Sequence, residues 1–208
     1  MKRIIFLAIF TAFYSGTCVF GQDKSHFAIQ YDMGFGTGDL GDFISKPSFR
    51  GASAQYRFAI NDNILVGVDA AWNIFYEKKD YDTYTQGSQT ISGIQYRYQN
   101  EIPVLIAADY LITTDKKIQP YVGLGIGTMY SERAVDMNLY RFELNPWHFA
   151  MKPEVGMLYE ISEKTSLKLA GKYYYGFETD DLDSQGYFTV SLGYRYFGIF
   201  HRHEFRQA

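Results

Sequence analysis

The strongest constraint on the fold is an alternation of apolar and polar residues with a period of two, which recurs along most of the chain. The stretch YVGLGIGTMY, residues 121–130, shows it in its simplest form, because Val122, Leu124 and Ile126 alternate with three glycines. Such alternation is typical of β-strands, whose successive side chains point to opposite faces of a sheet. Together with seven similar segments it predicts eight strands, at residues 27–35, 49–60, 64–76, 94–110, 121–130, 149–159, 167–175 and 188–196.

The connections between these segments are alternately short and long. Short connections at 61–63, 113–117 and 162–164 alternate with longer polar ones at 37–47, 77–90, 131–147 and 177–186. This is the layout of a transmembrane barrel, with short periplasmic turns and longer outer loops. Strands of about ten residues are long enough to cross the hydrocarbon layer, and no segment of the mature chain shows a helical period. We therefore expect an all-β fold: an eight-stranded antiparallel up-and-down transmembrane β-barrel.

Period two alone does not say which face of the sheet points outward. A soluble lipocalin would turn its apolar face inward, whereas a membrane barrel turns it toward lipid and ends it in aromatic girdles. Aromatic residues make up 18% of this chain, and tyrosines flank the apolar rows, as membrane interfaces favour. Charges of both signs on the polar face can neutralise one another inside a closed barrel. The sequence therefore predicts an interior polar network of Asp32, Asp69, Arg97, Glu101, Asp109, Lys152, Glu154, Lys172 and Arg195.

The glycines of residues 121–130 belong to the same polar face. We expect Gly123, Gly125 and Gly127 to point into the barrel, where glycine tolerates a sharply curled strand. A dinucleotide-binding loop would need the pattern G-x-G-x-x-G at the start of a helix, and this stretch reads G-x-G-x-G within a strand. The missing side chains are expected to leave room for larger neighbours: Arg97, Gln99, Lys152 and Glu154.

The first residues are typical of a secretion signal. Lys2 and Arg3 precede an apolar stretch at 4–13, and small residues before Gln22 suit signal cleavage. We expect a signal peptide at 1–21, a barrel domain at 22–200 and a polar tail at 201–208. Anchoring as a lipoprotein through Cys18, the one cysteine, is an alternative. Without residues 1–21 the chain has no cysteine, which excludes disulfides and thiolate metal sites, and its net charge falls from −3 to −5. Nothing in this balance suggests a nucleic-acid partner.

Three segments resemble a known family. EIPVLIAADYLI at 101–112, QPYVGLGIG at 119–127 and YFTVSLGYRYF at 187–197 are similar to segments of the small outer-membrane β-barrel family of Bacteroidota, described as porin-family or outer membrane protein beta-barrel domain. The resemblance implies the fold and a Gram-negative outer membrane, but no reaction. We expect a monomer without a cofactor, in contact with membrane lipid and lipopolysaccharide and inserted by the barrel assembly machinery. The tail from His201 onward obscures the terminal aromatic strand that serves as an assembly signal in the family.

Two groups of residues could hold a metal ion. His201 and His203 are two residues apart, but no Cys or carboxylate pattern accompanies them, and a polar tail is the better interpretation. The acidic stretch ETDDLDSQG at 178–186 lacks the frame of a calcium-binding loop, so it reads as a solvated outer loop that could touch divalent ions bridging lipopolysaccharide. We expect no metal site.

A lipid-modifying enzyme is a further alternative. His148 near the outer rim could combine with Ser131 or Ser184 and with Glu143, but no local spacing supports such a triad. We expect His148 to lie at the aromatic girdle beside Trp147, and we expect no enzymatic activity.

The interior charges leave two functions open. They could line a narrow pore for small solutes, but eight strands enclose just enough width for side chains to fill. We therefore expect a plugged outer-membrane barrel with a structural or surface-interaction role.

Overall fold

The computed structural model describes residues 25–86, 89–114, 117–137, 139–180 and 182–197. The expected signal peptide at 1–21, Cys18, and the tail with His201 and His203 lie outside the described residues. The boundaries of the predicted signal peptide and tail therefore stay predictions.

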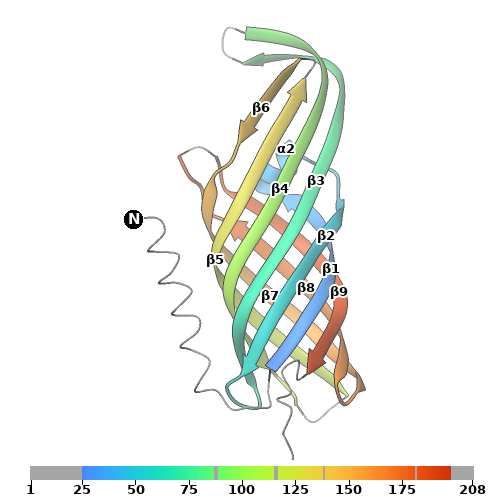
Figure 1. Ribbon diagram of the computed structural model, residues 1–208. Coiled ribbons are helices and arrows are strands. Elements are labelled where there is room, and N and C mark those ends of the chain that lie inside the picture. Colours follow the sequence, from blue (N-terminus) through green and yellow to red (C-terminus); the bar gives the residue numbers. More distant parts are fainter. Residues whose placement is uncertain (1–24, 87–88, 115–116, 138, 181, 198–208) are drawn as a thin grey trace, which may run out of the picture.

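The described residues form a closed antiparallel barrel (Figure 1). Each barrel strand pairs with the next in sequence, and the last pairs with the first, as in an up-and-down barrel. The prediction of an eight-stranded transmembrane-type barrel is confirmed. Its strands are β1 (Ser25–Thr37), β2 (Ser48–Ala59), β3 (Ile64–Gln86), β4 (Gln89–Leu111), β5 (Ile118–Met137), β7 (Trp147–Ser162), β8 (Thr165–Gly176) and β9 (Gln185–Phe197).

Two shorter elements lie at the outer end. The strand β6 (Tyr140–Leu144) pairs with the last residues of β5, and the helix α2 (Gly38–Phe43) lies between β1 and β2. A helix of six residues is too short to produce a helical period in the sequence, which is why the pattern did not reveal it. No helix in the described ranges is long and apolar enough to cross a membrane.

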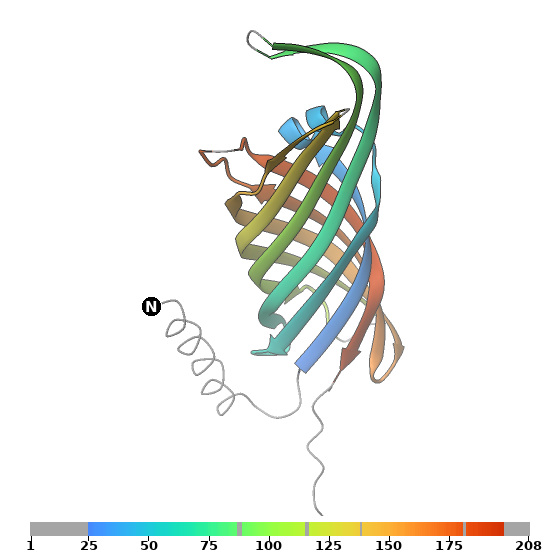
Figure 2. The same cartoon turned by 45° about the horizontal axis from the view of Figure 1, so that its top comes forward.

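The strands differ greatly in length, and this corrects the predictions for two loops. In the expected loop at 131–147, residues 131–137 continue β5 and residues 140–144 form β6. Residues 77–86 and 89–90, expected in a loop, continue β3 and β4 to 23 residues each. The hairpin extends past the other strands and bends at its tip (Figure 2). In its described part, the hydroxyls of Thr83 and Ser92 form a cross-strand hydrogen bond of 2.9 Å. Polar cross-strand pairs stabilise a hairpin in water without the apolar alternation that identifies a strand.

The apolar rows face outward. Val122, Leu124 and Ile126 are 44%, 49% and 48% exposed, whereas Asp32 and Lys172 are fully buried in the interior. The alternative of a lipocalin with an apolar interior is therefore wrong. Exposed aromatic side chains near the short turns form one girdle, including Phe58, Tyr110, Tyr159, Tyr194 and Tyr196. A surface of this kind is stable only against lipid.

The interior contains two apolar clusters. Near the outer end, Tyr187 stacks on Tyr174 at 4.7 Å between ring centroids and packs against Phe75 at 5.5 Å. Leu40 and Ile44, from α2 and the residue that follows it, enter this cluster and are fully buried. The second cluster lies near the short turns, around Leu65, Leu111, Tyr121, Leu158 and Ala170. Charged side chains fill the space between the two clusters.

Candidate functional site: the charged interior and the outer mouth

Arg57 lies at the centre of the interior charges. Its Nε donates to Oδ2 of Asp109 at 2.9 Å and its Nη2 to Oδ1 of the same carboxylate at 3.3 Å, while Nη1 donates to Asp69. All three side chains are at most 6% exposed. A guanidinium presents its donors in a fork that matches a carboxylate, so this arrangement fixes both partners. Three strands are thereby tied together: β2, β3 and β4.

A second group of charges extends from Asp69 across the barrel. Lys152 of β7 donates to both Asp69 and Glu154. The carboxylate of Glu154 also pairs with Lys168 Nζ at 3.0 Å and accepts hydrogen bonds from Tyr121 Oη at 2.6 Å and Gln55 Nε2 at 3.0 Å. A buried carboxylate with this many donors is well compensated for its lost hydration. The group links β2, β3, β5, β7 and β8 through side chains alone.

The third group is smaller. Lys172 Nζ donates to Ser53 Oγ at 2.7 Å and lies 3.3 Å from Asp32 Oδ1, which in turn accepts from Ser53 Oγ at 3.1 Å. Lys172, Asp32 and Ser53 come from β8, β1 and β2, so this group crosses the closing seam of the barrel. We call the three groups together the ionic core. It is formed by Asp32, Ser53, Gln55, Arg57, Asp69, Asp109, Tyr121, Lys152, Glu154, Lys168 and Lys172.

The ionic core contains six of the nine charged residues expected in the interior: Asp32, Asp69, Asp109, Lys152, Glu154 and Lys172. The other three lie elsewhere. Glu101 is buried nearer the outer end, where Ser131 Oγ and Gln99 Nε2 each donate to it at 2.7 Å. Arg97 lies at the outer mouth, and Arg195 lies at the opposite end without an ion-pair partner among the described residues.

The interior set predicted from the sequence did not include Arg57, Gln55, Ser53 and Lys168. In β2 the polar residues Ser53, Gln55 and Arg57 occupy alternate positions, so their parity placed them on the inner face. The alternation of apolar and polar residues was weakest in this strand, because its outward positions include the small residues Ala52 and Ala54. Lys168 shares the parity of Lys172 in β8 and could have been found in the same way.

Gly123 and Gly125 of β5 lie beside the ionic core, whereas a Cβ at Gly127 would meet Val104 and Leu105. A Cβ at Gly123 would lie 2.5 Å from Asp109 Oδ1, and one at Gly125 would lie 3.4 Å from Lys152 Cε. The expected neighbours were only partly right. Glu154 and Lys152 of β7 lie opposite Gly123 and Gly125, but Arg97 and Gln99 of β4 lie opposite Val135 and Arg133, farther up the same strand pair.

The outer mouth is closed by the segment that contains α2. The Phe43 ring lies between two guanidinium groups, with Arg97 at 5.0 Å and Arg133 at 4.2 Å from its centroid. Arg97 Nη1 also donates to the carbonyl oxygen of Phe43 at 2.9 Å, and Arg133 Nε donates to Gln99 Oε1 at 2.7 Å. Stacked cations and a fixed carbonyl hold this segment over the interior.

Glu77 provides a second attachment for the same segment. Its carboxylate accepts hydrogen bonds from the backbone N–H of Ser45 at 2.8 Å, the Ser45 hydroxyl at 3.1 Å and Lys79 Nζ at 2.9 Å. It lies on β3 beyond Tyr76, where the hairpin leaves the lipid-facing part of the barrel. Burial alone would raise the pKa of the Glu77 carboxyl, but the hydrogen bonds from Lys79 and Ser45 outweigh it and hold that pKa below the usual range.

The residues considered for a lipid-modifying site are each engaged elsewhere. Ser131 donates to Glu101, Ser184 Oγ lies 3.3 Å from Asp39 Oδ2, and Glu143 pairs with Arg141 on β6. Within the described ranges no hydrogen bond joins His148 to any of these serines or to Glu143. His148 is buried inside the barrel, with Nδ1 2.7 Å from the carbonyl oxygen of Phe177, rather than at the girdle with Trp147, which is exposed. The expected position of His148 was therefore wrong, because its parity in β7 points inward.

Metal ligands do not gather in the described parts of the chain. They contain no group of three or more His, Cys, Asp or Glu side chains placed to hold a metal ion. The carboxylates of the ionic core are instead surrounded by lysines and Arg57.

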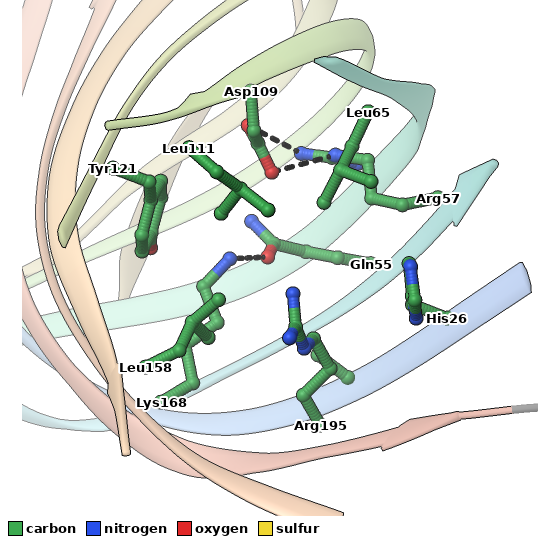
Figure 3. A pocket seen from close by; sticks show the side chains of 11 residues that line it. His26, Gln55, Arg57, Leu65, Asp109, Leu111, Tyr121, Leu158, Lys168 and Arg195 are labelled. Carbon is green, nitrogen blue, oxygen red and sulfur yellow. Dashed lines mark hydrogen bonds and ion pairs between the residues drawn. The ribbon is translucent and has the colours of Figure 1, made fainter. Parts of the chain in front are cut away.

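Large side chains occupy the interior. A cavity of about 10 Å³ lies at the end of the barrel near the short turns, lined by residues that include His26, Arg57, Lys168 and Arg195 (Figure 3). This is room for about one water molecule. A barrel interior so occupied by large side chains matches the expectation for eight strands.

Comparison with known proteins identifies the fold but no family. No protein-family model matches the chain, and none of the curated proteins matches it. Among solved structures, the Neisserial surface protein A, NspA, aligns with a TM-score of 0.55 at 15% identity, covering 83% of this chain and 96% of that one. Ail, the attachment invasion locus protein of Yersinia pestis, aligns at 0.50 and 13% identity over 85% and 100% of the two chains. OprG, an outer membrane protein of Pseudomonas aeruginosa, aligns at 0.50 and 13% over 88% and 99%.

These structures share a fold with this chain. The distribution of apolar and charged side chains in this chain is the one that a membrane-spanning barrel needs. The barrel is closed, its apolar rows face outward, and its charges are buried. The protein is therefore an integral β-barrel of the outer-membrane type, located in the outer membrane.

Proposed function

We propose that the protein is a non-conducting, non-enzymatic outer-membrane barrel that presents its protruding sheet as a docking surface for an extended polypeptide. We also propose that it is a monomer in contact with lipid and lipopolysaccharide and that it belongs to the Bacteroidota family whose strand segments it resembles. The observation that carries the docking role is the length of β3, β4 and β5, together with the free edge of β6.

The protruding sheet extends on one side of the membrane only. β3 and β4 have 23 residues each and β5 has 20, whereas β1, β2, β8 and β9 have 12 or 13. A tilted strand needs about 9–11 residues to cross the hydrocarbon layer. The excess therefore stands in water, as a sheet of four strands in the order β3, β4, β5, β6. A role in anchoring alone would not need this extension.

β6 leaves one edge of that sheet open. All five of its residues are exposed, and within the described residues it pairs only with β5. Tyr140, Phe142 and Leu144 alternate along it with Arg141 and Glu143, which form an exposed ion pair. An open edge offers unpaired backbone N–H and C=O groups, and apolar side chains beside them favour an added strand. A hollow of about 360 Å³ lies beside it on the outward face of β4, β5 and β6.

A narrow pore is the alternative function, and the interior argues against it. The ionic core crosses the barrel between two apolar clusters, and the segment with α2 covers the outer mouth. Planar-bilayer recording separates the two functions. We expect no steady single-channel current from the purified barrel, whereas a reproducible unitary conductance would favour the pore.

The docking role is tested by replacing residues 140–144 with a flexible Gly-Ser segment of equal length. A set of immobilised extended peptides with alternating apolar and polar residues serves as the probe. We expect the wild-type barrel in detergent to bind members of this set and the replacement variant to lose that binding. Heat-modifiable migration on a detergent gel shows whether both barrels are folded. Equal binding by the two proteins, or binding by neither, would contradict a docking role for β6.

A further inference from the structure

We propose that the periplasmic end of the barrel interior binds one small monovalent anion, such as chloride, beside the side chains of Arg195 and His26. This site is independent of the protruding sheet and of the docking role proposed above.

Arg195 is a buried cation outside the ion pairs of the ionic core. In the ionic core, Arg57, Lys152, Lys168 and Lys172 are each within ion-pair distance of a carboxylate of Asp32, Asp69, Asp109 or Glu154. Four cations thus face four anions. Arg195 is 4% exposed, yet no ion pair with it is found among the described residues. A buried charge without a counterion is costly, and a guanidinium does not lose its proton to avoid that cost.

Hydrogen-bonding groups are also left without partners at this end of the barrel. Arg195 Nε, His26 Nδ1 and Ser166 Oγ are buried and find no hydrogen-bond partner among the described residues. Ser166 lies directly opposite Arg195 in the β8–β9 pair, and His26 of β1 lies two positions below Ala28, the residue opposite Arg195. Arg195 Nε can only donate, whereas Ser166 Oγ and Nδ1 of a neutral His26 can each donate or accept. An acceptor at this position can satisfy both Arg195 Nε and His26 Nδ1.

The surroundings limit the acceptor to a small one. His26 and Arg195 line the cavity of about 10 Å³ with Arg57 and Lys168 (Figure 3). Leu65, Leu111 and Leu158 form apolar walls. The Phe197 ring packs against both Arg195, at 4.4 Å, and His26, at 4.6 Å. The space holds about one atom-sized occupant, which excludes phosphate and carboxylate ligands.

A water molecule would fit the same space but would add no negative charge beside Arg195. Asp109, the carboxylate that also lines the cavity, is already paired with Arg57. A halide carries a negative charge and accepts several hydrogen bonds. It therefore supplies both a counterion for Arg195 and an acceptor for the unpaired donors.

Crystals of the refolded barrel grown in sodium bromide test the site, because bromide gives an anomalous signal and water does not. We expect an anomalous peak within hydrogen-bond distance of Arg195 Nε and His26 Nδ1. The peak should be absent from an Arg195→Gln crystal and present in an Arg50→Gln crystal, because Arg50 is exposed on the outside of the barrel. Density without anomalous signal at Arg195 would identify a water and overturn the proposal.

A solution measurement keeps the proposal testable if Arg195→Gln does not fold. The ³⁵Cl resonance broadens when chloride exchanges with a protein site, so we expect wild-type barrel in detergent to broaden it beyond detergent alone. Competing bromide should reverse that excess. Broadening that matches the detergent blank, or that bromide leaves unchanged, would contradict a halide site.

Discussion

Arg57 and Asp109 form a two-pronged ion pair inside the barrel although β3 lies between their strands. The distances are 2.9 Å from Nε to Oδ2 and 3.3 Å from Nη2 to Oδ1. The residue of β3 opposite Arg57 is Gly67, whose inner face carries no side chain. The guanidinium can therefore reach past one strand to the next, and the ionic core depends on this reach.

Removing Arg57 should destabilise the barrel strongly. Arg57→Met leaves the Asp109 carboxylate buried without its cation, and breaking one partner of a buried pair costs about 3–5 kcal/mol. Urea unfolding of the barrel refolded into lipid vesicles measures this change in the free energy of unfolding.

Arg141→Met is the matched control, because the Arg141 side chain is 54% exposed and its ion pairs with Asp136 and Glu143 lie in water. Ion pairs this exposed contribute little to stability. If the two variants unfolded at the same urea concentration, the ionic core would have no special role in stability.

A side chain at Gly67 should destabilise the barrel. A Cβ there would lie 1.8 Å from the Tyr56 carbonyl oxygen, a backbone atom that moves only with its strand. We expect Gly67→Ala to lower the free energy of unfolding by about 1–3 kcal/mol, as overpacking does. Gly171→Ala is the control, because its nearest contact is 3.2 Å from the ring of Phe188. A smaller loss for Gly67→Ala than for Gly171→Ala would show that the strands do not approach as closely as described.

Acid should release the segment at the outer mouth. The folded pKa of Glu77 is below its usual range, so the stabilisation from its carboxylate is present above the unfolded pKa of about 4.3 and is lost as pH falls through the folded value. We expect protection of the Ser45 amide against hydrogen exchange, corrected for the intrinsic pH dependence, to fall in that acidic range. In Glu77→Gln the protection should be weaker and nearly independent of pH. Equal pH dependence in both proteins would exclude Glu77 as the group responsible.

Much of the fold could be predicted from whether each residue holds an odd or an even position within its strand. Alternation assigns each side chain to one face of a strand, and that assignment placed Lys152, Glu154 and Lys172 inside and Leu124 outside. The alternation of short and long connections gave the up-and-down order. Both signals come directly from the geometry of a strand that faces lipid on one side.

Parity gives the face of a residue but not its height along the barrel. Arg97 was placed beside the β5 glycines because it faces inward, whereas the register sets it opposite Val135 at the outer mouth. The polar extension of β3 and β4 was read as a loop because water, rather than lipid, surrounds it and removes the apolar row. The position of α2 and the contacts of Arg97 and Arg133 with Phe43 depend on segments that are distant in the sequence. No local pattern of residues predicts such contacts.

The orientation of the barrel wall is the central claim, and the quenching of tryptophan fluorescence tests it most directly. The chain has two tryptophans, and Trp147→Phe leaves Trp72, which is 55% exposed on the apolar face. In vesicles of lipid brominated on the acyl chains, we predict strong quenching of Trp72, with little quenching by acrylamide in the water. Strong quenching by acrylamide, with none by the brominated lipid, would contradict a wall that faces the membrane.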